Sequence, residues 1–335
     1  MRPELFELPF IHLTVKSYGL MMVIGFLAAV YLIRYLSRNI IPDPQLITNA
    51  ALYSLIAGVV GARIFYVVHY WEQFRGDPLS MFAIWEGGLE LLGGVLLAVS
   101  VIFIYLRYHR LPIRVYLDIL GIALVLALAF GRIGCFMNGC CFGKPTKLPW
   151  AVRFPYGSLA YRSQVNANPK RNRPEPQLNI PPEFFGYADK KGAWHSDLKP
   201  YEYLTDEQKE QIDNGLYRGL AVHPTQLYSS GFAVLWCFVL FLFWRRYQPG
   251  VSRRAGAGAR TKNMFCARPG CTFAMMFILY GSTRFFLEFV RDDNPFVYWG
   301  LTISQNISIA MVVLGSMMMF VFSSMGPPKA SRTKK

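Results

Sequence analysis

Apolar stretches alternate with short polar segments along most of the chain. The stretches lie at about 18–36, 48–70, 86–106, 116–138, 225–244, 271–290 and 300–322. Each is close to the roughly 20 residues that an α-helix needs to cross the hydrocarbon core of a bilayer. The pattern therefore predicts an all-α integral membrane protein with seven transmembrane helices.

A long polar insertion interrupts this pattern and divides the chain into four parts. Residues 1–138 hold the first four predicted helices behind an N-terminal outer segment, and residues 139–222 contain no apolar run long enough to span a membrane. Residues 223–323 hold the last three predicted helices, and residues 324–335 form a basic tail. We expect 139–222 to form a small, partly irregular head domain.

One short helix is predicted inside this head. Thr205 is a favourable N-cap residue, Asp206 and Glu207 would lie in the first turn, and Gly215 would stop the helix. The expected helix covers about 205–214.

The basic residues predict how the chain is oriented in the membrane. Short segments assigned to one side hold sixteen Lys and Arg residues, against four on the other side. Under the positive-inside rule, the N-terminus is outside, the C-terminus is cytoplasmic, and the head is extracytoplasmic. The net charge of +15 therefore follows the membrane edges, where it can contact anionic lipid headgroups, and gives no indication of nucleic-acid binding. A hydrophobic content of 53% and a mean hydropathy of +0.27 agree with a membrane protein.

Three arginines fall inside the apolar stretches. With a rise of about 1.5 Å per residue, the predicted topology places Arg63, Arg132 and Arg284 in the outer half of the membrane. Charged side chains at such depth are costly and usually face a protein interior or a water-filled cavity. Because arginine binds phosphate through planar bidentate hydrogen bonds, these residues predict an anion site. A phospholipid headgroup is the natural ligand.

Other polar residues fall at the same predicted level. Tyr280, Arg284 and Glu288 follow i, i+4, i+8 spacing and so share one helix face, with Arg291 next on the same stripe. Glu90 lies near the outer end of the third stretch. A structural ion pair between Arg284 and Glu288 is the alternative interpretation of the pair.

Cysteines are concentrated just after Arg132. Cys135, Cys140 and Cys141 could be a redox pair, with a disulfide between Cys135 and Cys140, or an acyl-accepting nucleophile. They could also be small residues at a tight helix end. Cys266 and Cys271 form a C-x4-C pair with no second pair or histidine nearby, so we expect no metal there.

Several motifs, taken together, resemble one family. GRIGCFMNGCCFG, from 131 to 143, is similar to the signature of prolipoprotein diacylglyceryl transferases, and YGLM, GGLELLGG, HPTQLY and YGSTRFFLEFVR extend the resemblance over all seven stretches. The resemblance implies a transferase of the bacterial plasma (inner) membrane. Such an enzyme moves the diacylglyceryl group of phosphatidylglycerol to the lipobox cysteine thiol of a preprolipoprotein and releases glycerol phosphate. No metal and no soluble cofactor are implied.

The residues and the resemblance together suggest a set of site residues. We expect a site facing the outer half of the membrane, in which Arg284 and Arg132 neutralise the phosphate, Tyr280 or Glu90 assists thiol deprotonation, and Asn138 positions the lipid. The candidate catalytic residues are Arg132, Tyr280, Arg284 and Glu90. The candidate phosphatidylglycerol-binding residues are Arg132, Asn138, Gly143, Tyr18, Arg63, Glu288 and Arg291.

The chain departs from the family pattern at positions that bear on mechanism. The family commonly has a catalytic histidine before its second Gly-Gly pair, where this chain has Leu92, and Cys135 and Cys140 stand where Asn and Glu are frequent. Ser229 stands where Glu is usual. A free thiol with a pKa near 8.5 is only about 3% thiolate at pH 7, and a positioned base typically contributes about 10² to 10⁴-fold.

Three functions therefore stay open at this point. The chain could be a transferase that uses another base, or a homologue that binds phospholipid without catalysis. It could also be an anion or lipid transporter, although the inner halves of the predicted spans are almost purely apolar apart from Asp118.

Overall fold

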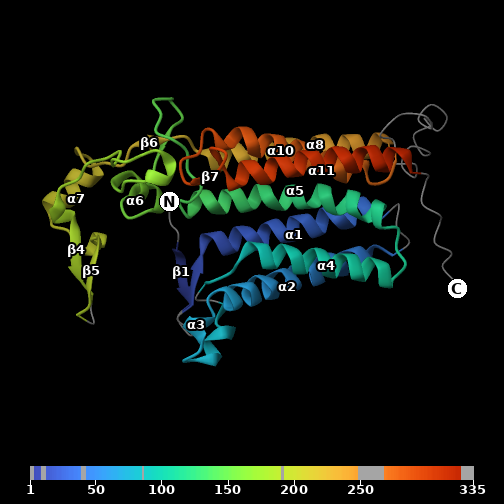
Figure 1. The fold of residues 1–335 in the computed structure, drawn as a ribbon, viewed down its shortest axis with the longest axis horizontal. Coiled ribbons are helices and arrows are strands. Elements are labelled where there is room, and N and C mark those ends of the chain that lie inside the picture. The colour runs from blue at the N-terminus through green and yellow to red at the C-terminus, as the bar shows by residue number, and fades with distance from the viewer. Residues whose placement is uncertain are drawn as a thin grey trace. The chain divides into compact units, whose positions relative to one another are not determined.

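The computed structural model describes residues 4–8, 13–38, 43–84, 87–189, 192–247 and 268–325. Long helices dominate it (Figure 1), and every apolar stretch predicted to be helical contains one. These helices are α1 (Ser17–Ser37), α2 (Pro44–His69), α4 (Leu91–Tyr108), α5 (Ile113–Met137), α8 (Thr225–Tyr247), α10 (Cys271–Glu288) and α11 (Ile303–Ser324).

Five of these helices are long and apolar enough to cross a membrane: α1, α2, α5, α8 and α11. Helix α4 is apolar but shorter, and α10 carries Arg284 and Glu288 in its last turns. The protein is therefore mostly helical, with five candidate membrane spans. Residues 248–267, which include Cys266, and nearly all of the basic tail lie outside the described residues.

The chain divides into two compact units. The first contains Met1–Leu27, Val125–Phe238 and Met276–Ser316, and the second contains Ala28–Leu124, Val239–Met275 and Met317–Lys335. Most long helices contribute residues to both units, whereas α2 and α4 lie wholly in the second.

In the second unit, α2 and α4 pack through glycines. A Cβ atom added at Gly61 would lie 2.5 Å from the carbonyl oxygen of Gly93, and one at Gly94 would lie 2.8 Å from that of Gly58. Only glycine permits backbones to approach this closely, as in other membrane helix pairs. Close helix packing thus accounts for the second Gly-Gly pair of the GGLELLGG motif. The segment before α4 contains α3 (Trp71–Phe74) and the short 3-10 helix η1 (Pro78–Phe82).

In the first unit, residues 139–222 contain short helices and paired strands. The paired strands are β3 (Val152–Arg153) with β6 (Ala221–Val222), and β4 (Phe185–Ala188) with β5 (Trp194–Leu198), all antiparallel. The short helices are α6 (Leu159–Val165), η3 (Pro169–Arg171), η4 (Pro182–Phe184), η5 (Tyr201–Tyr203) and α7 (Asp206–Asp213). The remaining strands are β1 (Glu4–Leu8) with β2 (Leu13–Lys16), and β7 (Phe296–Tyr298) with β8 (Leu301–Thr302).

The predicted helix of this insertion is confirmed. Thr205 caps α7: its hydroxyl accepts a hydrogen bond from the backbone amide of Gln208, and the side-chain oxygen of Gln208 accepts one from the backbone amide of Thr205. This reciprocal pair is a capping box. Ile212 on the buried side of α7 then packs with Phe184 and Leu204 in a small apolar cluster.

The turn after α5 is held by the start of α8. The hydroxyl of Thr225 donates to the carbonyl of Cys141 at 2.6 Å, and the side-chain amide of Gln226 donates to the carbonyl of Cys140 at 2.7 Å. The amide of Lys144 donates to the carbonyl of Val290 at 2.8 Å, just beyond α10. The turn therefore lies against both helices, beside the site described next.

Candidate active site

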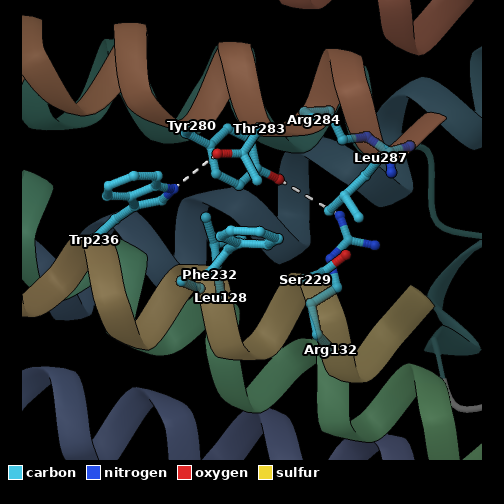
Figure 2. Close-up of a pocket in the computed structure, with 10 residues that line it drawn as sticks. Leu128, Arg132, Ser229, Phe232, Trp236, Tyr280, Thr283, Arg284 and Leu287 are labelled. Carbon is cyan, nitrogen blue, oxygen red and sulfur yellow. Dashed lines mark hydrogen bonds between the residues drawn. The ribbon is translucent and has the colours of Figure 1, made fainter. Parts of the chain in front are cut away.

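A pocket in the first unit opens between α5, α8 and α10 (Figure 2). The space between its walls, counted together with the solvent at its open mouth, is about 320 Å³. Figure 2 shows Arg132, Ser229 and Arg284 at one end, with Trp236 at the other. The lining residues are Leu128, Arg132, Ser229, Phe232, Ala233, Trp236, Tyr280, Thr283, Arg284 and Leu287. The pocket thus has a cationic end and a largely apolar end.

Arg132 enters this pocket from α5 and reaches α10. Its Nη2 atom donates to the hydroxyl oxygen of Tyr280 at 3.4 Å, and its Nη1 atom lies 3.9 Å from the Sγ atom of Cys141. A tyrosine hydroxyl and a cysteine thiol are both uncharged in their usual protonation states. Among the described residues, no carboxylate pairs with this guanidinium. Arg132 is therefore free to pair with an anionic ligand.

Arg284 lies on the opposite wall and is held from two sides. Its Nη2 atom lies 3.1 Å from the carboxylate of Glu288 and 2.8 Å from the hydroxyl of Ser304 at the start of α11. Its Nη1 atom is buried and has no hydrogen-bond partner among the described residues. Because a buried donor without a partner costs about 1–3 kcal/mol or more, this atom is suited to bind a ligand oxygen.

Glu288 is the acid that organises the cationic end. Its side chain is fully buried, and it lies near two arginines, with Arg291 at 3.8 Å. The amide of Asn294 donates to its other oxygen. Arg291 also makes two hydrogen bonds to Asp293, at 2.9 and 2.6 Å. Although burial opposes its charge, these bonds and the charge of Asp293 raise the pKa of Arg291 above its ordinary value.

The structure brings five of the predicted residues together in this way: Arg132, Tyr280, Arg284, Glu288 and Arg291. The alternative interpretation of Arg284 and Glu288 as an ion pair is also correct, and the ion pair leaves one arginine nitrogen unpartnered. The two interpretations are therefore compatible.

Gly143 joins this group through its backbone. It forms an isolated β-bridge with Arg291, and its amide donates to the carbonyl of His223 at 3.0 Å. An added Cβ atom would lie 2.6 Å from the Cβ of His223 and 2.7 Å from its carbonyl oxygen. Gly143 therefore permits a close approach of two backbones and offers no side chain to a ligand.

Asn138 and Tyr18 are placed near the same turn but make few polar contacts. Asn138 follows the end of α5 with an exposed side chain, and no side-chain hydrogen bond of Asn138 is found within the described part of the chain. Tyr18, in the first turn of α1, is 42% exposed and packs against Gly134 of α5. Both remain candidates for contact with a bound lipid.

Arg63 and Glu90 belong to the second unit. Arg63 is buried and donates to the backbone carbonyls of Ser80, Met81, Gly87 and Gly88 at 2.7, 2.8, 2.7 and 3.0 Å. Glu90 lies 3.4 Å from the ring of His69, and its amide donates to the carbonyl of Ala62. Leu92, the residue at the family's histidine position, is 59% exposed on α4.

The sequence did not reveal every contact of the cationic end. Ser304, Asp293 and Asn294 come from the segments after α10, and nothing in their spacing indicated that they would contact Arg284, Arg291 and Glu288. The TISQ and DDNP segments, 302–305 and 292–295, show no periodicity that could have placed them. The proximity of Ser229 to Arg132 in the pocket was likewise missed.

The turn from 131 to 143 also gathers the cysteines. Cys141 adopts a left-handed backbone conformation, with φ of 62°, directly before Phe142, and Gly139 has φ of 71°. The sulfur atoms of Cys135, Cys140 and Cys141 lie within 4.8 Å of one another, and none of the three forms a disulfide. The suggested Cys135 to Cys140 disulfide is therefore absent from this structure.

These features define a helical membrane protein with a candidate anion site at the polar end of an apolar pocket. The family model described as prolipoprotein diacylglyceryl transferase matches residues 3–321. The chain therefore belongs to the prolipoprotein diacylglyceryl transferase family, a family of transferases.

Similar proteins agree with this assignment over most of their length. A phosphatidylglycerol–prolipoprotein diacylglyceryl transferase of Clostridium tetani is 28% identical over 96% of this chain and 97% of its own length. A protein of the same name from Trichormus variabilis is 32% identical over 90% of this chain and 84% of its own. Another, from Burkholderia cenocepacia, is 30% identical over 92% and 90%.

Proposed function

We propose that the chain transfers the diacylglyceryl group of phosphatidylglycerol to the lipobox cysteine thiol of preprolipoproteins, the first step of bacterial lipoprotein maturation. The names of its relatives describe this activity. The observation that carries the proposal is the pair of arginines at one end of the pocket, with the buried Nη1 atom of Arg284 unpartnered.

The phosphate of the lipid would bind between Arg132 and Arg284. Both guanidinium groups line the pocket from opposing helices, so they can approach the phosphate from two sides. The apolar end, with Phe232 and Trp236, would accommodate the adjoining hydrocarbon of the diacylglyceryl group. This division of polar and apolar surface matches an amphipathic substrate with an anionic headgroup.

The reaction is a displacement at carbon. The thiolate sulfur forms a bond to the terminal glyceryl carbon, the bond from that carbon to the phosphate oxygen breaks, and the electron pair leaves with glycerol phosphate. Charge grows on the departing phosphate, so arginines fixed in a water-poor site stabilise the transition state more than the ground state. Arg132 and Arg284 supply this stabilisation.

Glu288 and Arg291 would act by positioning. Glu288 lies beneath Arg284 and Arg291 with no exposed surface, so it orients the guanidinium groups and does not itself contact substrate. Arg291 is engaged by Asp293 and holds the strand-like contact with Gly143. Tyr280 accepts from Arg132, which leaves its own O–H free to donate to the lipid or to carry a proton. Asn138 and Tyr18 would contact the lipid at the rim of the site.

For Arg63 we propose a supporting role in place of the expected contact with the lipid headgroup. Four backbone carbonyls already accept hydrogen bonds from its guanidinium group, so it supports the backbone at Ser80, Met81, Gly87 and Gly88 in the second unit. Glu90 remains a candidate for proton transfer from the lipobox thiol.

The topology proposed from the sequence completes this assignment. All seven long helices would span the inner membrane, with the N-terminus outside, the C-terminal tail in the cytoplasm, and the insertion over 139–222 as an extracytoplasmic head. This topology divides the chain into four parts, 1–138, 139–222, 223–323 and 324–335. The active site would then face the outer half of the membrane, where preprolipoproteins emerge.

A reconstituted assay tests the proposed function. The full chain, purified in detergent, is incubated with phosphatidylglycerol and a lipobox peptide, and the mass of the peptide is measured. A gain equal to one diacylglyceryl group is expected, and none is expected with a peptide that has Ser in place of the lipobox Cys. Lipid binding without any mass gain would indicate a homologue without catalysis. Movement of anion or lipid across vesicles, without peptide modification, would indicate a transporter.

A further inference from the structure

Three thiols form a compact cluster next to the anion site. Cys135 lies in the last turn of α5, and Cys140 and Cys141 follow three and four residues after its end. The amide of Cys140 donates to the carbonyl of Cys135 at 3.2 Å, which folds the chain back on the helix. The left-handed backbone of Cys141 then turns its side chain toward the same place, and all three sulfur atoms lie within 4.8 Å of one another.

This arrangement suits a thiophilic metal ion. Zinc binds thiolates at about 2.3 Å with tetrahedral geometry, which places neighbouring sulfurs about 3.8 Å apart. Each distance between two of the three sulfur atoms therefore needs to shorten by about 1 Å at most, and rotation of the side chains can supply this. No His, Asp or Glu side chain joins the cluster among the described residues. A zinc ion held here would keep its fourth position open, as in catalytic zinc sites.

The surrounding charge is compatible with such an ion. Three thiolates and a divalent ion carry a net charge of −1. The Nη1 atom of Arg132 lies 3.9 Å from the Sγ atom of Cys141 and would neutralise that charge. The same guanidinium lines the pocket where the phosphate would bind, so the metal and the departing phosphate would be neighbours.

We propose that Cys135, Cys140 and Cys141 hold a zinc-class metal ion whose open fourth position binds the lipobox thiol of the preprolipoprotein as a thiolate. This inference rests on the proposed function and deepens it. It also revises the expectation, drawn from the family resemblance, that no metal takes part.

The metal would promote deprotonation of the lipobox thiol, for which Leu92 offers no base. A thiol that coordinates zinc is deprotonated at neutral pH, so its proton is released to solvent when the peptide binds. The coordinated sulfur then forms the bond to the glyceryl carbon, and the bond from that carbon to the phosphate oxygen breaks. The thioether product is a weaker ligand than the thiolate, so it leaves the metal. No oxidant or reductant is needed.

Metal binding can be measured without any activity. The full chain, purified with a reductant, is stripped with a chelator and titrated with Co²⁺, whose thiolate complexes absorb strongly in the near ultraviolet; zinc content is measured in parallel. We expect one ion per chain. Each of C135S, C140S and C141S should weaken binding at least tenfold, and the triple variant should abolish it. Cys237→Ser, on α8 and outside the cluster, should bind metal as the unchanged protein does.

A second measurement tests the open position. A lipobox peptide added to the Co²⁺-loaded protein should change its absorption spectrum, and a peptide with Ser in place of Cys should not. The inference is overturned if the unchanged chain binds no ion, if the triple variant binds as well as the unchanged chain, or if the Cys peptide leaves the spectrum unaltered.

Lipidation separates this inference from the proposed function. Full lipidation by the metal-free protein and by the triple variant would overturn the metal inference and leave the transferase standing. Specific metal and peptide-thiol binding without lipidation under any condition would instead support the site and contradict the transferase. Restoration of lipidation when Zn²⁺ is returned to the stripped protein is the result that supports both.

Discussion

The Nη2 atom of Arg284 lies 3.1 Å from the Oε2 atom of Glu288, one turn further along α10, and the side chain of Glu288 is fully buried. Arg291 approaches the same carboxylate at 3.8 Å. One buried acid thus lies beside two arginines, of which Arg284 lines the pocket. Removing its charge would leave both cations without that compensation.

Glu288→Gln should therefore destabilise the protein strongly. The substitution keeps the shape of the side chain but removes its charge, and breaking a buried ion pair typically costs about 3–5 kcal/mol. We expect a clearly lower thermal midpoint in detergent, together with reduced lipidation. Glu202→Gln, on the exposed side chain of η5, is a matched control and should unfold as the unchanged protein does. Equal midpoints for the two variants would contradict the positioning role of Glu288.

Arg284→Lys should lose most of the activity although it keeps the positive charge. A lysine cannot reach Ser304 and Glu288 while also presenting a second donor to the phosphate. We expect lipidation to fall about 10² to 10³-fold, the usual cost of removing one donor that stabilises developing charge. Initial rates with phosphatidylglycerol and a lipobox peptide provide the measurement.

The fold of this variant must be checked independently. Size-exclusion chromatography and thermal unfolding of Arg284→Lys should match the unchanged protein closely, because the ion pair with Glu288 can persist. A folded Arg284→Lys variant with near-normal rates would remove Arg284 from the phosphate site. Arg284→Ala would then be expected to retain activity as well.

The sequence predicted the helices of this protein well and its site only in part. Long apolar runs determine where helices form, and the Thr205 cap determined α7, because both depend on local residue order. The i, i+4 spacing also predicted that Arg284 and Glu288 would meet. Local order could not show that Ser304 would contact Arg284, since that contact joins two helices through an irregular segment.

The contacts of Arg63 show a second limit of reading the sequence. Its predicted depth followed from the helical rise, but depth does not reveal which way a side chain points or what accepts its hydrogen bonds. The acceptors are the backbone carbonyls of Ser80, Met81, Gly87 and Gly88, and every residue type has a backbone carbonyl. Sequence therefore gave no signal for them. The concentration of cysteines after Arg132 was visible in the sequence, but the approach of all three sulfur atoms to within 4.8 Å was not, because the left-handed conformation of Cys141 cannot be read from local residue order.

Gly143→Ala should destabilise the junction between the turn and α8. The new methyl group would lie 2.6 Å from the Cβ of His223 and 2.7 Å from its backbone oxygen, so the backbone must shift. Overpacking of this kind typically costs about 1–3 kcal/mol. Gly231→Ala is a suitable control, because Gly231 lies within α8 and an added Cβ would meet nothing within 4 Å. Unfolding in detergent should show a lower midpoint for Gly143→Ala and an equal or higher one for Gly231→Ala. The prediction fails if the two variants unfold alike.

Tyr280→Phe distinguishes two roles of the tyrosine hydroxyl. At 3.4 Å its bond to Arg132 is long, so its loss should disturb the guanidinium only slightly. If the hydroxyl only orients Arg132, the variant should raise KM for phosphatidylglycerol a few-fold and leave the dependence of kcat on pH unchanged. We expect this result, because the metal-bound thiolate proposed above needs no base. A kcat that falls 10²-fold or more, with a new dependence on pH, would instead assign proton transfer to Tyr280.

Arg63→Lys separates support of a loop from phosphate binding. The guanidinium donates to four backbone carbonyls, and an ammonium group cannot reach all of them at once. Each hydrogen bond contributes about 1 kcal/mol and a buried carbonyl left unpaired costs more, so we expect a lower thermal midpoint and faster proteolysis at the loop residues that accept these bonds, 80–81 and 87–88. At a temperature where the variant is folded, its KM for phosphatidylglycerol should equal that of the unchanged protein. Arg132→Lys provides the comparison, with little effect on proteolysis of that loop and a raised KM. A raised KM for folded Arg63→Lys, with the loop as resistant as before, would return Arg63 to the headgroup site.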